Sequence, residues 1–401
     1  MRESVDVDVD VVDMDVVSLE SVAVVALRQR VDVRVTESVL VREAEALGLR
    51  LTVSWVDTVD ELVATNHRLS AEGQPLLTLT TADCGPMTLL AEGSGSTVRV
   101  DLSMADRDRS AELVAHVRGR GLDGLVWGLR ALVFRRQSPA VPSRYGSHPD
   151  QHGQLRLPES RSGAVPIVVL LHGGFWRSKW EMDLMDALAV DLVQHGFASW
   201  NVEYRRPDRH GWEATSRDVE ASIRHLARLD VPDLDLGAIA LVGHSAGGQL
   251  AVRAAADLAR GQGITPAMVV SLAGVLDLHE TYGRDLGDGA ALAALGAAPD
   301  VDPEAYARSS PLALLPVGVS TLVVTANDDS PDLNEMSCRY AQAARSAGDP
   351  VTQLTGAGDH FTLIDPSSDI WRDVRSHLRP LQDNADTRST TSGGTPPHAA
   401  R

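Results

Sequence analysis

The second half of the chain alternates short aliphatic runs with segments of helical period. Residues 167–171 form such a run, bounded by Pro166 and by a His-Gly-Gly turn, as expected for a strand buried on both faces. Similar runs lie at 198–202, 238–242, 268–272, 321–325 and 351–354, and helices are predicted near 182–194, 214–229 and 246–260. This alternation predicts a mostly parallel sheet with helices on both faces.

The first half has a similar but shorter pattern. Strands are predicted at 22–27, 49–53, 76–79 and 98–102, and helices near 39–47 and 125–134. The segment 110–118 has the composition of a further helix. We expect a smaller, flavodoxin-like α/β domain in this part of the chain.

Composition changes mark the expected boundaries. Residues 1–20 alternate Val with Asp and are read as a disordered acidic leader, because a row of carboxylates without basic partners repels itself. A stretch rich in Pro, Gly, Ser and His predicts a linker at 137–160, and a Ser/Thr/Gly/Pro-rich tail is predicted to be disordered from 382 to 401. The two predicted domains are therefore residues 21–136 and 161–381.

Charge and cysteine content exclude several classes of function. A net charge of −18 disfavours binding to nucleic acid or to an anionic membrane surface, and no apolar run reaches the roughly 20 residues of a membrane span. Cys84 and Cys338 are too few for a disulfide framework or a cysteine-built metal site. The N-terminus lacks the features of a secretory signal, so we expect a cytoplasmic protein. We also expect that it uses no metal or cofactor.

A serine between two glycines follows the predicted strand 238–242. Gly243-His244-Ser245-Ala246-Gly247 matches G-x-S-x-G, in which the glycines allow a sharp turn from strand to helix that exposes the serine. The alternative is a glycine-rich turn with a serine N-cap. The predicted strand before it and helix after it favour a nucleophile at Ser245.

A glycine-rich turn also follows the first buried strand of the second block, as His172-Gly173-Gly174-Phe175-Trp176. Backbone N–H groups in such a turn can bind the oxyanion of a tetrahedral intermediate, with another N–H from the residue after the nucleophile. We expect the donors at Gly174, Phe175 and Ala246.

A general base and an orienting acid are predicted further along the chain. His360 follows the last predicted strand, where it can reach Ser245. Two adjacent carboxylates, Asp328 and Asp329, follow the preceding strand, and only one can orient the imidazole. Both remain candidates on position alone, with Asp329 preferred.

The segments HGGFW, NVEYRR, GHSAGG, NDDSP and GDHF resemble, in order and spacing, the arylformamidase (kynurenine formamidase) and BD-FAE-like esterase group of α/β-hydrolases. The resemblance covers most of residues 160–380. It implies an α/β-hydrolase fold, hydrolysis of an ester or an N-formyl aryl amide, and Asp329 as the acid. Trp176 matches the family's usual tryptophan, and Trp176, His244 and Tyr204 are candidates for the substrate pocket.

The first block looks like a type II 3-dehydroquinate dehydratase that has lost its catalytic groups. Thr80 and Pro86 stand where that family has Asn and His, and Arg99 and Asp101 replace its Glu and His. We therefore expect a noncatalytic domain that binds a ligand or assembles subunits into a homo-oligomer. A G-x-G-x-x-G match at residues 119–124 is rejected as a dinucleotide fingerprint, because the segment before it is predicted to be helical.

These observations favour a cofactor-free serine hydrolase with a small-molecule ester or amide as substrate. A second hypothesis is a noncatalytic binding or scaffold protein with a relict hydrolase fold. A third is residual dehydroquinate dehydratase activity in the first block.

Overall fold

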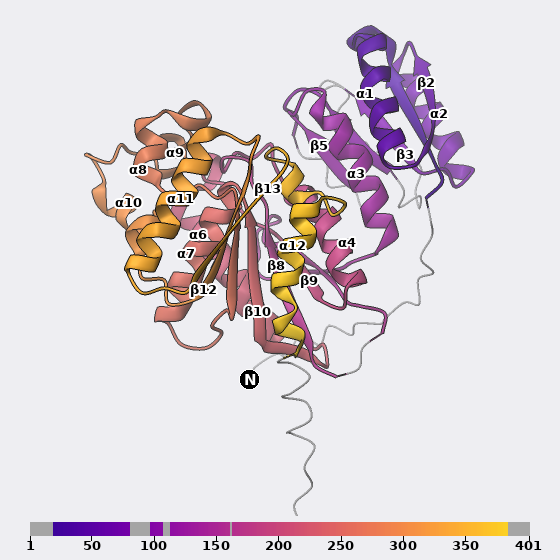
Figure 1. Cartoon of the computed structure of the whole chain (residues 1–401). Helices are drawn as coiled ribbons and strands as arrows, with labels where there is room; N and C mark the ends of the chain where they lie inside the picture. The colour runs from indigo at the N-terminus through magenta and orange to yellow at the C-terminus, as the bar shows by residue number, and fades with distance from the viewer. Residues whose placement is uncertain (1–18, 81–96, 107–112, 161–162, 384–401) are drawn as a thin grey trace, which may run out of the picture. The chain divides into compact units, whose positions relative to one another are not determined.

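A computed structural model describes residues 19–80, 97–106, 113–160 and 163–383 (Figure 1). The chain divides after Pro139 into an N-terminal unit and a C-terminal unit. Nearly all of the predicted leader and tail lie outside the described residues. Gln382 is an exception: its side-chain amide donates to the carbonyl of His195 at 2.8 Å, so the expected disordered tail begins at least two residues too early.

The N-terminal unit is a five-stranded parallel sheet in the order β2-β1-β3-β4-β5. This is the strand order of flavodoxin-like folds, as the sequence predicts. Its strands are β1 (Ser21–Leu27), β2 (Arg50–Val56), β3 (Leu76–Thr80), β4 (Thr97–Asp101) and β5 (Leu113–Arg118). Its α-helices are α1 (Val33–Ala46), α2 (Val59–Ala71) and α3 (Asp123–Gln137).

The prediction of a helix over residues 110–118 is wrong for residues 113–118, the part that the structure describes. Leu113–Arg118 is strand β5, which pairs with β4, and α3 begins five residues after β5 ends. The G-x-G-x-x-G segment therefore connects a strand to a helix, contrary to the prediction. The segment nevertheless follows the last strand of the sheet, whereas the fingerprint belongs to the first strand–helix turn.

The C-terminal unit contains an eight-stranded sheet in the order β13-β12-β11-β10-β8-β9-β7-β6. The six strands from β13 to β9 in this order are parallel, and they are β8 (Val165–Leu171), β9 (Ala198–Glu203), β10 (Leu234–His244), β11 (Met268–Leu272), β12 (Ser320–Ala326) and β13 (Val351–Gly356). This mostly parallel sheet confirms the fold predicted for this part of the chain.

Helices cover both faces of the sheet (Figure 1). They are α4 (Asp186–Gln194), α5 (Pro207–His210), α6 (Trp212–His225), α7 (Ala246–Arg260), α8 (Leu278–Gly283), α9 (Leu286–Leu295), α10 (Pro303–Ser309), α11 (Pro331–Ser346) and α12 (Asp369–Leu378), with short 3-10 helices at Met182–Met185, Leu226–Arg228, Pro311–Leu314 and Thr362–Ile364. Among the described residues, none of the helices has the length and apolar character that crossing a membrane requires.

The predicted linker at 137–160 is not a linker. It contains β6 (Val141–Arg144) and β7 (His152–Arg156), which add an antiparallel hairpin to the edge of the sheet at β9. The Trp200 ring fills the space beside Gly153: a Cβ added to this glycine would lie 2.3 Å from the nearest atom of the ring. The polar composition misled the prediction, because an edge hairpin buries few apolar residues and Leu155 is one of them.

Candidate active site

Ser245 lies at the junction of β10 and α7. Its backbone angles, φ 55° and ψ −122°, are strained for a residue with a side chain, and such strain is common at functional sites. The turn is possible because a Cβ at Gly243 would be 2.0 Å from the Gly247 carbonyl oxygen, and one at Gly247 would be 2.1 Å from the Leu171 carbonyl oxygen. The two glycines of the motif therefore permit β8, β10 and α7 to meet at the serine.

His360 and Asp329 form a hydrogen-bonded pair on the loops after β13 and β12. Nδ1 of His360 lies 2.8 Å from Oδ2 of Asp329. Asp329 is buried, and its other carboxylate oxygen accepts a hydrogen bond from the Ser330 N–H at 2.6 Å. Asp328 is exposed, and no hydrogen bond joins it to the imidazole of His360, both of which are described. Of the two candidate acids, the structure brings Asp329 to the histidine.

His244 connects the serine turn to the His360 loop. Nε2 of His244 lies 3.0 Å from the carbonyl oxygen of His360, and the two rings are 4.5 Å apart between centroids. Burial and the neighbouring His360 lower the pKa of His244 well below its usual value, so it is neutral and donates this hydrogen bond through Nε2. Among the described side chains, Ser245 and His360 are not joined by a direct hydrogen bond.

The glycine-rich turn after β8 lies against the serine. A Cβ at Gly173 would be 2.9 Å from the Cβ of Ser245. Gly174, Phe175 and Trp176 all have positive φ, at 110°, 48° and 57°. Residues with a side chain rarely adopt a positive φ, and here two of them, Phe175 and Trp176, do so in succession after Gly174. The turn therefore needs outside contacts to hold it.

Trp176 provides such a contact. It is buried, and its indole N–H donates to Oε1 of Gln249 on α7 at 3.2 Å. The side-chain amide of Gln249 donates in turn to the carbonyl of Ser309 at 2.8 Å. This chain of hydrogen bonds ties the strained turn to the helix that follows Ser245. Gln249 was missed from the sequence, where its only signal is a polar residue on the apolar face of the helix after the serine.

His172 and Tyr204 pack against each other at the start of the glycine-rich turn. Their rings stack at 4.3 Å, and the Tyr204 hydroxyl donates to the His172 carbonyl at 2.8 Å. Burial, with the positive charge of Arg206 nearby, lowers the pKa of His172 to about 3, so its ring is neutral although Glu203 lies 3.4 Å away. Arg206 also pairs with Glu203, which explains why that carboxylate does not stabilise an imidazolium.

The three predicted pocket residues, Trp176, His244 and Tyr204, are all buried. The Tyr204 hydroxyl donates to the carbonyl of His172, just after β8, and its ring packs in the core, so these contacts do not favour a place in the pocket, which stays a prediction. Phe175 is partly exposed instead, and its ring lies within 3 Å of where a Cβ at Gly287 would be. Arg177 fixes that opposite segment, since its guanidinium donates to the carbonyls of Gly287 and Asp288 at 2.5 and 2.9 Å.

The comparisons with known proteins agree with this architecture. The BD-FAE family model matches residues 154–331. Kynurenine formamidase from Danio rerio is 28% identical over 236 residues, which cover 55% of this chain and 74% of that protein. Its counterpart from Salmo salar is 26% identical over 235 residues, with the same coverage of 55% and 74%.

The C-terminal unit has the α/β-hydrolase fold and is similar to the arylformamidase/BD-FAE group. Among solved structures, esterase B from Lactobacillus rhamnosis covers 63% of this chain and 87% of its own, with a TM-score of 0.54 and 18% identity. At that identity the likeness supports the fold of the hydrolase unit alone. The resemblance of the N-terminal unit to type II dehydroquinate dehydratases stays a prediction.

Proposed function

We propose that the hydrolase unit cleaves a carboxylic ester or an aryl formamide through an acyl-enzyme, with Ser245 as nucleophile, His360 as general base and Asp329 as the orienting acid. The observation that carries this proposal is the 2.8 Å contact between His360 Nδ1 and Asp329 Oδ2, on loops at the same edge of the sheet as the strained turn at Ser245. The comparisons support the coarser statement of a hydrolase acting on ester or amide bonds.

In this mechanism Ser245 Oγ attacks the carbonyl carbon while Nε2 of His360 takes the hydroxyl proton. Asp329 accepts from Nδ1–H, which fixes the tautomer with a free Nε2 and stabilises the imidazolium that forms. The tetrahedral oxyanion is bound by the N–H groups of Phe175 and Ala246, with Gly174 as a further donor.

Collapse of the intermediate breaks the bond to the leaving group, an alcohol or an aryl amine, which takes its proton from His360. Water then attacks the acyl-enzyme, or formyl-enzyme, with His360 again as base, and the acid and free Ser245 are released. The network from Trp176 through Gln249 to Ser309 keeps the oxyanion donors in place without reorganisation during the reaction.

The experiment compares wild type with Ser245→Ala on p-nitrophenyl acetate, longer p-nitrophenyl esters and N-formylkynurenine. We expect turnover of at least one of these substrates, and a loss of a thousandfold or more in kcat in the variant. Preference within the panel separates an esterase from a formamidase. Equal activity of the alanine variant would contradict the assignment of Ser245.

The two other hypotheses make different predictions. A noncatalytic binding protein would turn over nothing in the panel. Residual dehydratase activity would require catalytic groups in the N-terminal unit, where Thr80, Arg99 and His116 instead bond the buried carboxylate of Asp101 at 2.6, 3.0 and 2.7 Å. Burial alone would raise the pKa of Asp101, but hydrogen bonds from His116 and Thr80 and the charge of Arg99 lower it. These contacts favour a structural carboxylate, and a dehydroquinate assay tests it.

A further inference from the structure

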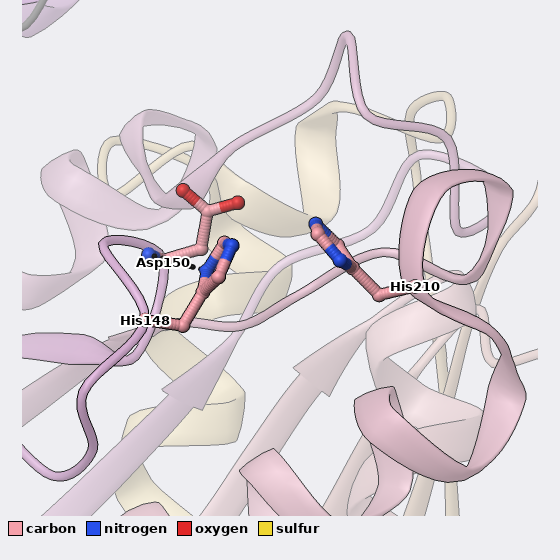
Figure 2. Close-up of side chains that lie close together, drawn as sticks. All are labelled: His148, Asp150 and His210. Atoms are coloured by element: carbon pink, nitrogen blue, oxygen red, sulfur yellow. Dashed lines mark hydrogen bonds between the residues drawn. The ribbon is translucent and has the colours of Figure 1, made fainter.

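A second cluster of functional side chains lies in the hydrolase unit outside the Ser245 site. It consists of His148 and Asp150, on the loop between β6 and β7, and His210, the last residue of α5 (Figure 2). We call these three residues the His148 cluster. Because His152 pairs with Glu203 at the end of β9, the loop lies beside the carboxyl end of the sheet.

The three side chains converge. One ligand atom from each lies within 4.8 Å of the other two, and the imidazoles of His148 and His210 meet edge to face with centroids 4.6 Å apart. Asp150 is buried, His148 is half-buried and His210 is exposed, so the cluster is closed on one side and open to solvent on the other. Among the described residues, none forms a hydrogen bond with the His210 imidazole.

Two imidazoles and a carboxylate are the ligands that a transition metal prefers. Zn²⁺ is commonly held by three such groups with water in the fourth position, whereas Mg²⁺ and Ca²⁺ require oxygen ligands almost exclusively. We propose that His148, Asp150 and His210 form a Zn²⁺ site with a water-filled position facing solvent. The sequence analysis expects no metal, because His210 is far along the chain from His148 and Asp150 and only the fold brings the three together.

Binding of the ion changes one hydrogen bond of His148. The Asp150 N–H donates to Nδ1 of His148 at 3.1 Å, which places the neutral ring's proton on Nε2. A half-turn of the His148 ring gives up this single hydrogen bond and frees a nitrogen for the metal. The Asp150 carboxylate also lies 3.7 Å from Arg206, whose closer partner is Glu203, so the guanidinium can stay where it is.

The ion would fasten the β6–β7 loop to α5. That helix is already joined to the segment after the oxyanion turn, since the Ser178 N–H donates to Asp208 of α5 at 2.9 Å. Arg205, just before α5, makes a two-pronged ion pair with Asp218 of α6. A metal at the His148 cluster would therefore stabilise the loops on one side of the candidate active site without touching its reacting atoms.

The test uses the full-length, untagged chain after removal of metals with a chelator. Zn²⁺ alone is titrated by calorimetry, and Co²⁺ is titrated by its visible absorption, which reports nitrogen and oxygen ligands in a four- or five-coordinate site. We expect one ion per chain, and a loss of affinity of about 100-fold or more in His148→Ala and in His210→Ala. His210 is exposed, so its removal is expected to leave the fold intact.

The matched control is His377→Ala, because His377 is a partly exposed histidine on α12, far along the chain from the cluster. This control should bind Zn²⁺ as the wild type does, and Zn²⁺ should raise the Tm of both but not that of the cluster variants. Ser245→Ala should also bind normally, which separates this site from the proposed catalytic one. Binding that is unchanged in His210→Ala, or absent from the wild type, would overturn the proposal.

Discussion

At the scale of single residues, the pairing of His360 with Asp329 distinguishes two neighbouring carboxylates. Asp329 is 9% exposed and bonds the imidazole, whereas Asp328 is exposed. Neighbouring residues on a turn face in different directions, so one step along the chain separates a group that can orient the histidine from one that cannot.

We predict that Asp329→Asn lowers kcat by a factor on the order of 10³–10⁴, because the amide cannot hold the imidazole in the required tautomer. Asp328→Asn is the matched control and should keep wild-type activity. Steady-state kinetics on the best ester or formamide substrate give the comparison. A similar loss in both variants, or a larger one in Asp328→Asn, would remove Asp329 from the triad.

A buried neutral histidine also predicts how stability depends on pH. The pKa of His172 is lowered to about 3 by burial and by Arg206. In the unfolded chain His172 binds a proton near pH 6.5, whereas in the folded chain it does not. The contribution of the neutral His172 ring to the free energy of unfolding is therefore complete above pH 6.5. It is lost as the pH falls towards 3, at about 1.4 kcal/mol per pH unit from this group.

In His172→Gln, the free energy of unfolding should therefore fall less steeply as the pH is lowered. The variant is less stable than wild type at pH 7, and the difference between the two shrinks as the pH falls towards 4. Urea unfolding followed by tryptophan fluorescence at a series of pH values measures this, with His377→Gln, at a partly exposed histidine, as control. A difference that stays constant with pH would mean that His172 is not the group responsible.

At the scale of elements, the β6–β7 hairpin changes the extent of the hydrolase unit. It extends the sheet at β9, where Gly153 admits the buried Trp200 ring. The same hairpin carries the loop with His148 and Asp150, so a segment that reads as a linker contributes to both the edge of the fold and the proposed metal site.

Gly153→Ala should destabilise the hydrolase unit by about 1–3 kcal/mol, because the added methyl group overlaps the Trp200 ring and the core cannot expand to admit it. Gly283→Ala is a suitable control, since a Cβ there would meet nothing within 4 Å. Denaturant midpoints report both changes. Equal stability of Gly153→Ala and wild type would show that the hairpin does not pack against β9 in this way.

At the scale of the whole molecule, every residue assigned to the hydrolase reaction lies in the C-terminal unit, after the division at Pro139. The described strands of the two units form separate sheets. No described residue of the N-terminal unit is assigned a role in the chemistry proposed here.

A fragment that begins at Ala140 should accordingly fold and retain kcat and KM within about threefold of the full chain. One that begins at Gly163 lacks β6 and β7 and should be insoluble or unfolded, because β9 is left with an unpaired edge and exposed apolar side chains. Circular dichroism and kinetics of the two fragments distinguish these outcomes. Loss of activity in the longer fragment would assign a catalytic or stabilising role to the N-terminal unit.

The sequence by itself determined the features that depend on local pattern. Buried parallel strands read as continuous aliphatic runs, and α7 and β11 begin and end where the pattern places them. The Ser245 turn could also be predicted, because the glycines around it are required by close backbone contacts within a few residues.

Only the tertiary structure decided the features that depend on contacts between distant residues. The hydrogen bonds between Asp329 and His360 and between Trp176 and Gln249 are two examples. The others are the pairing of β5, in place of a predicted helix, and the proximity of His148 and His210. The physical reason is the same for all four. A hydrogen bond, an edge pairing or a ligand cluster is set by where strands end in space, and the local periodicity of the chain carries no information about that distance.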